Sequence, residues 1–396
     1  MNNFSYVKIS DIGTVTTGRT PKTSNANNYG NDYMFIGPTD LHKHFFITES
    51  ERMVTQQGFD SIKSSTLNGT SVLVGCIGWD MGNVGIVDAA CVTNQQINSI
   101  TNIKDSYNPY YIYYWLKTKK DFLFSQATVT RTPILNKSTF SNIEIYIPSE
   151  RSLQDGLVEI LIAIDKKIEL NNQINAELEA MAKTLYDYWF VQFDFPDADG
   201  KPYKSSGGKM VYNEVLKREI PEGWGDCSLG DITELYQPQT ISEKEMLDEG
   251  RYLVYGANGI VGRYDQYNHE ESVVTITCRG NSCGTINFTR PFSWITGNAM
   301  VVKPKSVLLV PDYILNLLSS SGVDNVITGS AQPQITRTNL SPLSVINPNQ
   351  EMLKKYASIA TNLFEKRICI LEENEMLAKL RDWLLPMLMN GQVTVN

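Results

Sequence analysis

The chain has 396 residues, more than one domain of ordinary size, so two or three domains are expected. Its hydrophobic content of 42% and aromatic content of 10% indicate a folded, soluble protein with real cores. No apolar run approaches the roughly 18 residues of a membrane span, and the N-terminal segment lacks the layout of a signal peptide. The net charge is −8 and no segment is a basic tail, which argues against a nucleic-acid partner. If the chain binds DNA, its own nonspecific affinity should be modest, and other subunits would have to neutralise much of the phosphate charge.

The cysteine and histidine content excludes two common kinds of site. The six cysteines are scattered and form no CxxC pair, and the chain has only three histidines. This pattern predicts reduced thiols in a cytoplasmic protein and no structural zinc.

Two kinds of segment alternate along the chain. Residues 1–150 consist of β-branched and aromatic runs broken by glycine, asparagine and proline, which predicts a mixed α/β domain rich in hairpins and loops. Residues 151–195 have a long helical pattern, and 196–223 form a connector. A second α/β domain is predicted over 224–348, and a second long helix over 349–396.

The second half of the chain repeats the first at an offset of about 200 residues. PILNKSTFSNIEIYIPS at 133–149 matches PQITRTNLSPLSVINPN at 333–349, and AIDKKIELN at 163–171 matches LFEKRICIL at 363–371. Such a period indicates a tandem domain duplication, because the units of a solenoid are far shorter.

Both helical patterns carry an apolar seam that repeats every 3.5 residues, as in a coiled coil. In the first helix the seam residues are Leu157, Leu161, Ile164, Ile168, Asn171, Asn175, Leu178, Ala182, Leu185 and Trp189. In the second they are Ala360, Leu363, Ile370, Leu377, Leu384 and Leu388, interrupted by Arg367, Asn374 and Arg381. We expect the two helices to pack antiparallel, with Asn171, Asn175 and Asn374 fixing the register. Two separate core helices are the alternative.

The predicted helices are long enough to act as a spacer. Residues 153–189, at a rise of 1.5 Å per residue, would form a rod of roughly 55 Å. That length corresponds to about 16 base pairs of DNA. Two domains held so far apart would contact one face of a duplex at two separate places.

Common nucleotide-binding motifs are missing from the sequence, and three histidines leave little room for a Ser/His/Asp site. A pair of catalytic carboxylates or such a site stays open. GGK at 207–209 lacks the rest of a phosphate-binding loop, and no GxGxxG is present. The segment NPYY at 108–111 is similar to the Asn/Asp-Pro-Pro-aromatic segment of adenine methyltransferases, but Tyr110 replaces the second proline. We interpret it as the start of a short duplicated helix, and a stand-alone adenine methyltransferase, testable by S-adenosylmethionine binding, as the rival hypothesis.

Over essentially its whole length the chain resembles the specificity subunits of Type I restriction–modification enzymes. The most specific stretch is WFVQFDFPDADGKPYKSSGGKMVYNEVLKREIPEGW at 189–224, which in this family connects the first long helix to the second target recognition domain. A second is GSAQPQITRTNLSPLSVINP at 329–348. The first half departs from it at Thr132, where the second copy has Gln332.

The resemblance implies a noncatalytic protein that reads DNA. Each target recognition domain would read one half of a split DNA sequence, and the two helices would set the unread gap. The subunit would have no cofactor of its own. It would recruit two methyltransferase subunits, which use S-adenosylmethionine to methylate adenine, and restriction subunits, which use ATP and magnesium. A coiled-coil scaffold without a DNA role is a third hypothesis, and loss of binding to every DNA sequence would favour it.

Candidate DNA-binding residues are the basic and amide side chains expected in loops, since these types read base edges in the major groove. They are Arg19, Lys22, Lys43 and Arg131 in the first domain, and Arg263, Arg279, Asn281, Arg290, Gln332, Gln334 and Arg337 in the second. The glycine-rich loops at 78–85 and 279–284 could let the backbone approach phosphate. Candidate partner-docking residues are the aromatic ones that end the helices, namely Tyr188, Trp189, Phe190 and Trp383. A role in the core is the alternative for them.

Overall fold

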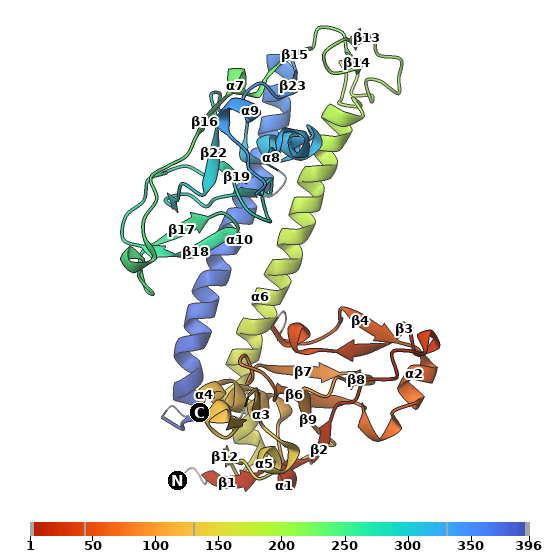
Figure 1. Cartoon of the computed structure of the whole chain (residues 1–396), viewed down its shortest axis with the longest axis vertical. Coiled ribbons are helices and arrows are strands. Elements are labelled where there is room, and N and C mark those ends of the chain that lie inside the picture. The colour runs from red at the N-terminus through yellow and green to blue at the C-terminus, as the bar shows by residue number, and fades with distance from the viewer. Residues whose placement is uncertain (1–3, 43–44, 130, 330–331, 393–396) are drawn as a thin grey trace. The chain divides into compact units, whose positions relative to one another are not determined.

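The chain forms two compact units in a computed structural model that describes residues 4–42, 45–129, 131–329 and 332–392 (Figure 1). The first unit is Met1–Asn172 with Glu373–Asn396, and the second is Gln173–Glu372. Each unit contains one mixed α/β domain and one segment of each of two long helices. The two units thus divide both long helices between them, whereas the sequence-based boundaries treat each helix as a separate segment. Those boundaries stay a prediction.

The α/β domain of the first unit is built on an antiparallel sheet of order β2-β9-β6-β7. The strands are β2 (Thr14–Thr17), β6 (Thr70–Gly75), β7 (Val84–Asp88) and β9 (Ile97–Thr101). Their β-branched side chains, such as Val72 and Ile86, are buried with the aromatic residues of helix α3 (Pro109–Lys117). This sheet and helix form the main core of the domain.

A second, smaller sheet of order β4-β3-β8-β5 completes this domain, and in it β3 and β8 run parallel. Its strands are β3 (Tyr29–Ile36), β4 (Arg52–Val54), β5 (Thr66–Leu67) and β8 (Cys91–Thr93). The remaining elements are β1 (Phe4–Lys8), α1 (Ile9–Ile12), α2 (Gln56–Asp60), α4 (Lys120–Ser125), β10 (Thr128–Val129), β11 (Pro133–Ile134), α5 (Lys137–Ser141) and β12 (Glu144–Pro148). Strands β1 and β12 pair antiparallel, as do β10 and β11.

The second unit repeats this plan. Its main antiparallel sheet has the order β16-β22-β19-β20, and a three-stranded sheet has the order β18-β17-β21. The strands are β16 (Thr233–Tyr236), β17 (Tyr252–Gly256), β18 (Gly259–Tyr264), β19 (Val274–Thr277), β20 (Ile286–Phe288), β21 (Trp294–Ile295) and β22 (Ala299–Pro304). The other elements are β13 (Met210–Asn213), β14 (Arg218–Pro221), β15 (Gly225–Ser228), α7 (Leu229–Ile232), α8 (Pro311–Ser320), α9 (Arg337–Leu340) and β23 (Ser344–Asn347).

The main sheets of the two units correspond strand by strand. Strand β2 corresponds to β16, β9 to β22, β6 to β19 and β7 to β20, while the β1–β12 pair corresponds to β15–β23. Helix α8 takes the place of α3, and both begin with a proline in the first turn. The tandem duplication predicted from the sequence is confirmed.

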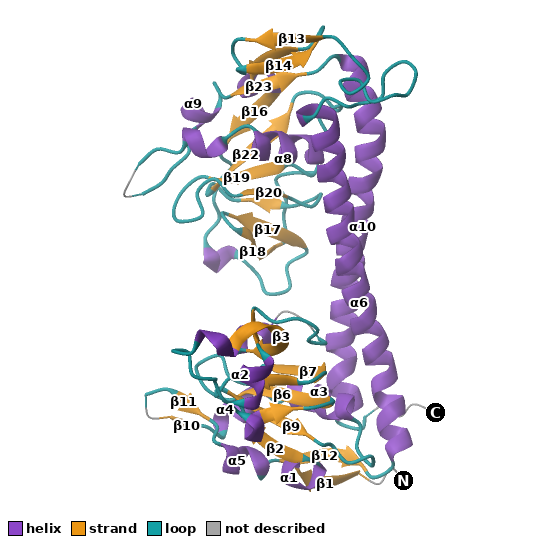
Figure 2. Cartoon of the chain, turned by 90° about the vertical axis from the view of Figure 1, so that its right-hand side faces the viewer, coloured by secondary structure: helices purple, strands orange, loops and turns teal. Residues whose placement is uncertain are grey.

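The long helices are α6 (Arg151–Tyr186) and α10 (Gln350–Met389), and in each unit their segments lie along one side of the α/β domain (Figures 1 and 2). In the first unit the Asn171 amide donates to Glu373 at 2.7 Å and to Asn374 at 2.8 Å. Farther along the pair, Arg381 donates to Asp165 at 2.7 Å. Because the residue number falls along one helix as it rises along the other, the segments run antiparallel, as expected.

The polar seam residues of the helices form specific pairs within the units. In the second unit Arg367, on α10, bonds to Glu179 on α6 at 3.1 Å. The predicted register-setting bonds are observed for Asn171 and Asn374, whereas the Asn175 amide has no hydrogen-bond partner among the described residues. Neither α6 nor α10, nor any other helix in the described part of the chain, is long and apolar enough to cross a membrane.

Candidate nucleic-acid interface

Four loop segments of the first unit meet at one end of its main sheet. The Arg19 amide donates to the Thr93 carbonyl at 2.8 Å, where the chain leaves β2. The Cys76 amide, at the end of β6, donates to the Gln96 carbonyl at 2.7 Å, just before β9. The Gly78 amide donates to the Pro133 carbonyl at 3.0 Å, which adds the β10–β11 hairpin. We call residues 18–22, 76–83, 94–96 and 131–135 the first loop face.

The first loop face gathers three of the four DNA-binding candidates from this half. Arg19 and Lys22 are exposed on the loop that follows β2, and Arg131 is exposed in the hairpin. Lys43 lies outside the described residues. Sequence reasoning missed Gln95, an exposed amide whose Oε1 accepts a hydrogen bond from Thr20 at 2.7 Å. The available signal was its position in an Asn-Gln-Gln run directly before a buried strand.

Hydrogen bonds and two glycines shape the glycine-rich turn of this face. Gly78 and Gly82 have φ angles of 103° and 91°, a region that glycine enters at little cost. Lys120 donates to Asp80 at 2.8 Å and to Asn83 at 3.1 Å, and so ties both arms of the turn to α4. The hydrogen bond from Lys120 lowers the pKa of the Asp80 carboxyl. These bonds hold both arms of the turn against α4.

The second unit contains an equivalent arrangement. The Cys278 amide, after β19, donates to the Asn298 carbonyl at 3.2 Å, before β22. The Gly280 amide donates to the Pro333 carbonyl at 3.2 Å. The Gln237 side chain, after β16, donates to the Gly297 carbonyl at 3.2 Å. We call residues 237, 278–284, 296–298, 328–329 and 332–335 the second loop face.

Four of the predicted residues meet on the second loop face. Arg279 and Asn281 are exposed on the glycine-rich turn, and Gln332 and Gln334 are exposed on the neighbouring segment. The backbone of Gln334 pairs with Thr328, with N–O distances of 2.8 and 2.9 Å, so a second turn supports the first. Arginine, asparagine and glutamine are the side chains that form bidentate pairs with guanine and adenine edges.

The structure does not bring the other three candidates of this half to the second loop face. Arg263 lies half-buried on β18, in the smaller sheet, and donates to the Gly250 carbonyl at 3.1 Å. Arg290 follows β20, which runs back from the loop face, so it lies at the opposite end of the sheet. Arg337 begins α9 and lines a depression along β16 with Lys305. Their DNA-binding role stays a prediction that this geometry does not support.

The methyltransferase-like segment NPYY is the start of a helix. The Asn108 side chain caps α3, because its Oδ1 accepts from the Tyr110 amide at 2.7 Å. Its amide nitrogen donates to Asp155 at 2.6 Å, and its backbone amide donates to Gln154 at 2.7 Å. Both ends of this buried side chain are occupied by structural bonds, so Asn108 is not available to hold a flipped base.

The docking candidates divide into buried and exposed side chains. Trp189 is only 4% exposed and Phe190 is fully buried. Their rings contact Tyr356 of α10, with centroid distances of 5.8 and 4.9 Å. Placing these two on a docking surface is therefore corrected: they belong to the core of the second unit, as the alternative interpretation held.

Tyr188 and Trp383 remain as exposed docking candidates, and Trp383 is 62% exposed. Sequence reasoning missed Met376 and Leu380, which are also exposed and stand seven and three residues before Trp383. This spacing places the three on one face of α10. In the second unit Met181 is exposed on α6, seven residues before Tyr188.

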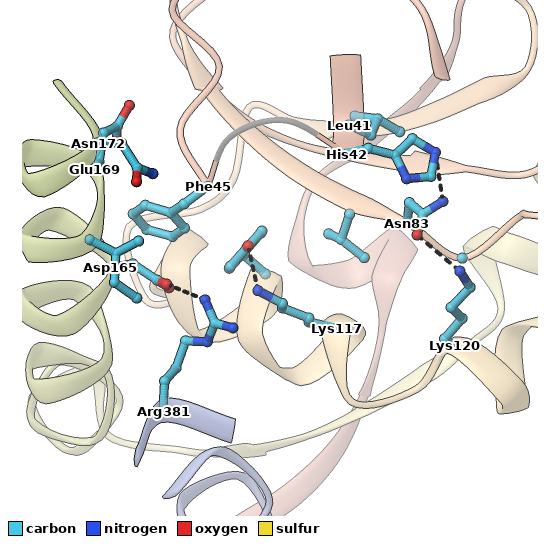
Figure 3. A pocket seen from close by; sticks show the side chains of 14 residues that line it. Leu41, His42, Phe45, Asn83, Lys117, Lys120, Asp165, Glu169, Asn172 and Arg381 are labelled. Atoms are coloured by element: carbon cyan, nitrogen blue, oxygen red, sulfur yellow. Dashed lines mark hydrogen bonds and ion pairs between the residues drawn. The ribbon is translucent and has the colours of Figure 1, made fainter. Parts of the chain in front are cut away.

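A pocket of about 500 Å³ in the first unit lies between its helix segments and the α/β domain (Figure 3). Arg381 and Asp165 form an ion pair on its wall, and the Tyr114 hydroxyl donates to Asp165 at 2.6 Å. Burial lowers the pKa of Lys117 on the same wall. The charges largely offset one another, and no cluster of metal-ligating side chains occurs in the described ranges. The pocket is a structural junction between helix pair and domain.

A comparison with known proteins identifies the class of protein that has this fold. The model of the Type I restriction modification DNA specificity domain matches residues 1–180 and 221–378. The chain belongs to this family of Type I restriction–modification specificity subunits.

Individual relatives agree with this assignment. The chain is 28% identical over 418 aligned positions to the Type I restriction enzyme MjaIX specificity subunit of Methanocaldococcus jannaschii, which covers 98% of this chain and 93% of that protein. It is 36% identical over 166 positions to the HindI specificity subunit of Haemophilus influenzae, covering 40% of this chain and 33% of that one. The crystal structure of the S subunit of the Type I system from M. genitalium matches with a TM-score of 0.62 at 18% identity, covering 98% and 96%.

Proposed function

We propose that the two loop faces each read one part of a two-part DNA sequence. The observation that carries the proposal is the recurrence of four loop segments at the same end of equivalent sheets, with exposed basic or amide side chains in both units. Arg19 and Arg131 supply these groups in the first unit, and Arg279 and Gln334 supply them in the second. Side chains of these types hydrogen-bond base edges and phosphates.

The protein is a specificity subunit and has a noncatalytic role. We propose that methylation is carried out by partner methyltransferase subunits that hold S-adenosylmethionine. Cleavage would be carried out by restriction subunits that use ATP and magnesium. With its net charge of −8, this chain would depend on the partners for much of the phosphate neutralisation.

We propose two methyltransferase subunits for each specificity subunit, one at each unit. The support is that each unit exposes apolar side chains at its long helices, among them Leu380 and Trp383 on α10 in the first unit. In the second they include Met181 on α6 and Tyr188 in the turn that follows it. Exposed apolar side chains grouped on one helix face are typical of protein interfaces.

Mapping of methylated adenine tests the proposed function. The chain is co-expressed with its cognate methyltransferase subunit in a methylation-free host, and N6-methyladenine is located across the genome by single-molecule sequencing. We expect a split motif with a fixed gap. A continuous motif would mean that only one unit reads DNA, and absence of methylation from a soluble, assembled complex would contradict the proposal.

A further inference from the structure

Trp79 stands at the tip of the glycine-rich turn in the first loop face, and its side chain is 70% exposed. We propose that the Trp79 indole makes an apolar contact with a base of the DNA half-site read by the first unit. The inference rests on the proposed function and names a specificity-determining residue that sequence reasoning missed. Trp79 and Ile134 are the large apolar side chains exposed on the described part of the first loop face. Contact with DNA would remove this apolar surface from water, which is favourable.

The turn that carries Trp79 has a counterpart in the second unit. Met81 and Cys283 donate their amides to the carbonyls of Gly78 and Gly280 at 3.3 and 3.0 Å. The closing residues, Gly82 and Gly284, donate to the carbonyls of Gly75 and Thr277 at 2.8 and 3.0 Å, and all four turn glycines have positive φ. Because the two turns match residue by residue in this pattern, Trp79 corresponds to Asn281.

This equivalence gives the two faces different chemistry at the same place. Asn281, an amide, suits the donor and acceptor edge of adenine. Trp79 offers no such pair, since its indole has one donor and a large apolar surface. It suits either the methyl group of thymine in the major groove or the exposed face of an unstacked base.

The surroundings of Trp79 extend the apolar contact area. Its ring lies 6.1 Å from that of Phe124, tilted by 36°, and most of the indole stays open. Ile134 on β11 is exposed and pairs with Ile77 at the base of the turn. Arg131, in the same hairpin as Ile134, is exposed. A positive charge on this loop face favours DNA over an apolar protein partner.

Both neighbours of Trp79 along the turn are held by contacts within the domain. Asp80, next to Trp79, forms an ion pair with Lys120 at 2.8 Å and lies 3.0 Å from His42. Met81, on the other side, is buried in the core of the domain. A contact made from such a turn does not incur the cost of ordering a loop.

The test uses the complex with the methyltransferase subunit and a duplex that carries both mapped half-sites. We expect Trp79→Ala to weaken binding about five- to a hundredfold and to relax the motif at one position of one half-site. Trp79→Phe should retain most of the affinity. The matched control is Tyr6→Ala, since Tyr6 is an exposed aromatic residue of the same unit, 68% exposed, outside the loop face.

Two modified duplexes distinguish the kinds of base contact. If Trp79 contacts a thymine methyl, uracil at that position weakens wild-type binding but leaves the Trp79→Ala complex unaffected. If it stacks on an unstacked base, the indole quenches 2-aminopurine placed there, so the bound duplex is dimmer with the wild type than with Trp79→Ala. The inference would be overturned if neither modified duplex gave its response at any half-site position. It would also be overturned if Trp79→Ala kept the affinity and the motif of the wild type.

Loss of subunit assembly in Trp79→Ala would overturn the inference in favour of a protein contact. A wild type without a split motif would instead overturn the proposed function itself.

Discussion

The two loop faces share one backbone frame and differ in the side chains that the frame carries. In both units the chain leaves the third strand of the main sheet through a five-residue turn closed by two glycines with positive φ. The tip holds Trp79 in the first unit and Asn281 in the second. Backbone hydrogen bonds fix the frame, so the tip residue can change without altering the fold. A duplicated protein can in this way read two different half-sites.

The two units also share an arginine–aspartate pair at the long helices, and the two pairs differ in burial. In each unit an arginine of α10 pairs with a buried aspartate: Arg381 with Asp165, and Arg367 with Asp312, both at 2.7 Å. The side chains of the second pair are only 5% and 1% exposed, while Arg381 is 17% exposed. The pair in the second unit is therefore better shielded from solvent, and its loss should cost more.

The largest effect on stability should come from replacing Trp189, and comparison with Trp383 distinguishes a core residue from a surface residue. Trp189→Ala leaves a cavity against Tyr356 and should lower the free energy of unfolding by about 3–5 kcal/mol. Trp383→Ala, at an exposed site, should leave the melting temperature nearly unchanged and lower recruitment of the methyltransferase subunit. Calorimetry and co-purification measure the two effects. Equal stability of both variants would contradict the core position of Trp189.

Next in size is the difference between the two arginine–aspartate pairs. Arg367→Ala should destabilise the protein by about 3 kcal/mol, because it leaves the Asp312 carboxylate buried without its cation. Burial already raises the pKa of Asp312. Arg381→Ala should cost less, since Tyr114 still donates to Asp165. Urea unfolding compares the variants, and a larger loss for Arg381→Ala would reverse the proposed order.

A smaller effect should make the second unit sensitive to acid. Burial, with a smaller contribution from the positive charge of Lys303, lowers the pKa of His269 to about 4. The His269 Nε2 lies 2.8 Å from the Tyr236 hydroxyl. Between pH about 6.5 and 4 the unfolded chain binds a proton that folded His269 does not, so stability falls as the pH falls. The loss is at most about 3 kcal/mol, and screening by solvent makes it smaller. His269→Gln should flatten this part of the stability profile; an unchanged profile would contradict the assignment.

The domain organisation could be predicted well from the sequence, because apolar positions that recur along the chain determine it. The duplication, the two α/β domains and the two long helices follow from sequence patterns that recur about 200 residues apart. The aromatic run at the end of α6 was harder to interpret. Trp189 and Phe190 are buried because the connector folds back over them with Trp224, whose ring lies 5.8 Å from that of Phe190. The aromatic composition of a segment does not reveal whether another part of the chain covers it.

The loop faces could be predicted only in part. Arg19, Arg131 and Arg279 stand where the chain leaves or joins a strand, and such places are recognisable from turn residues. Strand pairing decides at which end of the sheet a residue lies. Because β20 runs antiparallel to β19, Arg290 lies away from the loop face. Trp79 was overlooked because the loop at 78–85 was interpreted through its glycines, as backbone that could approach phosphate.

The most direct test of two independent reading faces is the methylation map of Arg131→Ala and Arg279→Ala beside that of the wild type. Each arginine is exposed, so both variants should fold and assemble. We expect each to relax or weaken recognition in a different half-site, by about tenfold in methylation rate, while the other half-site and the gap stay unchanged. Maps in which both variants alter the same half-site, or neither alters any, would contradict the account.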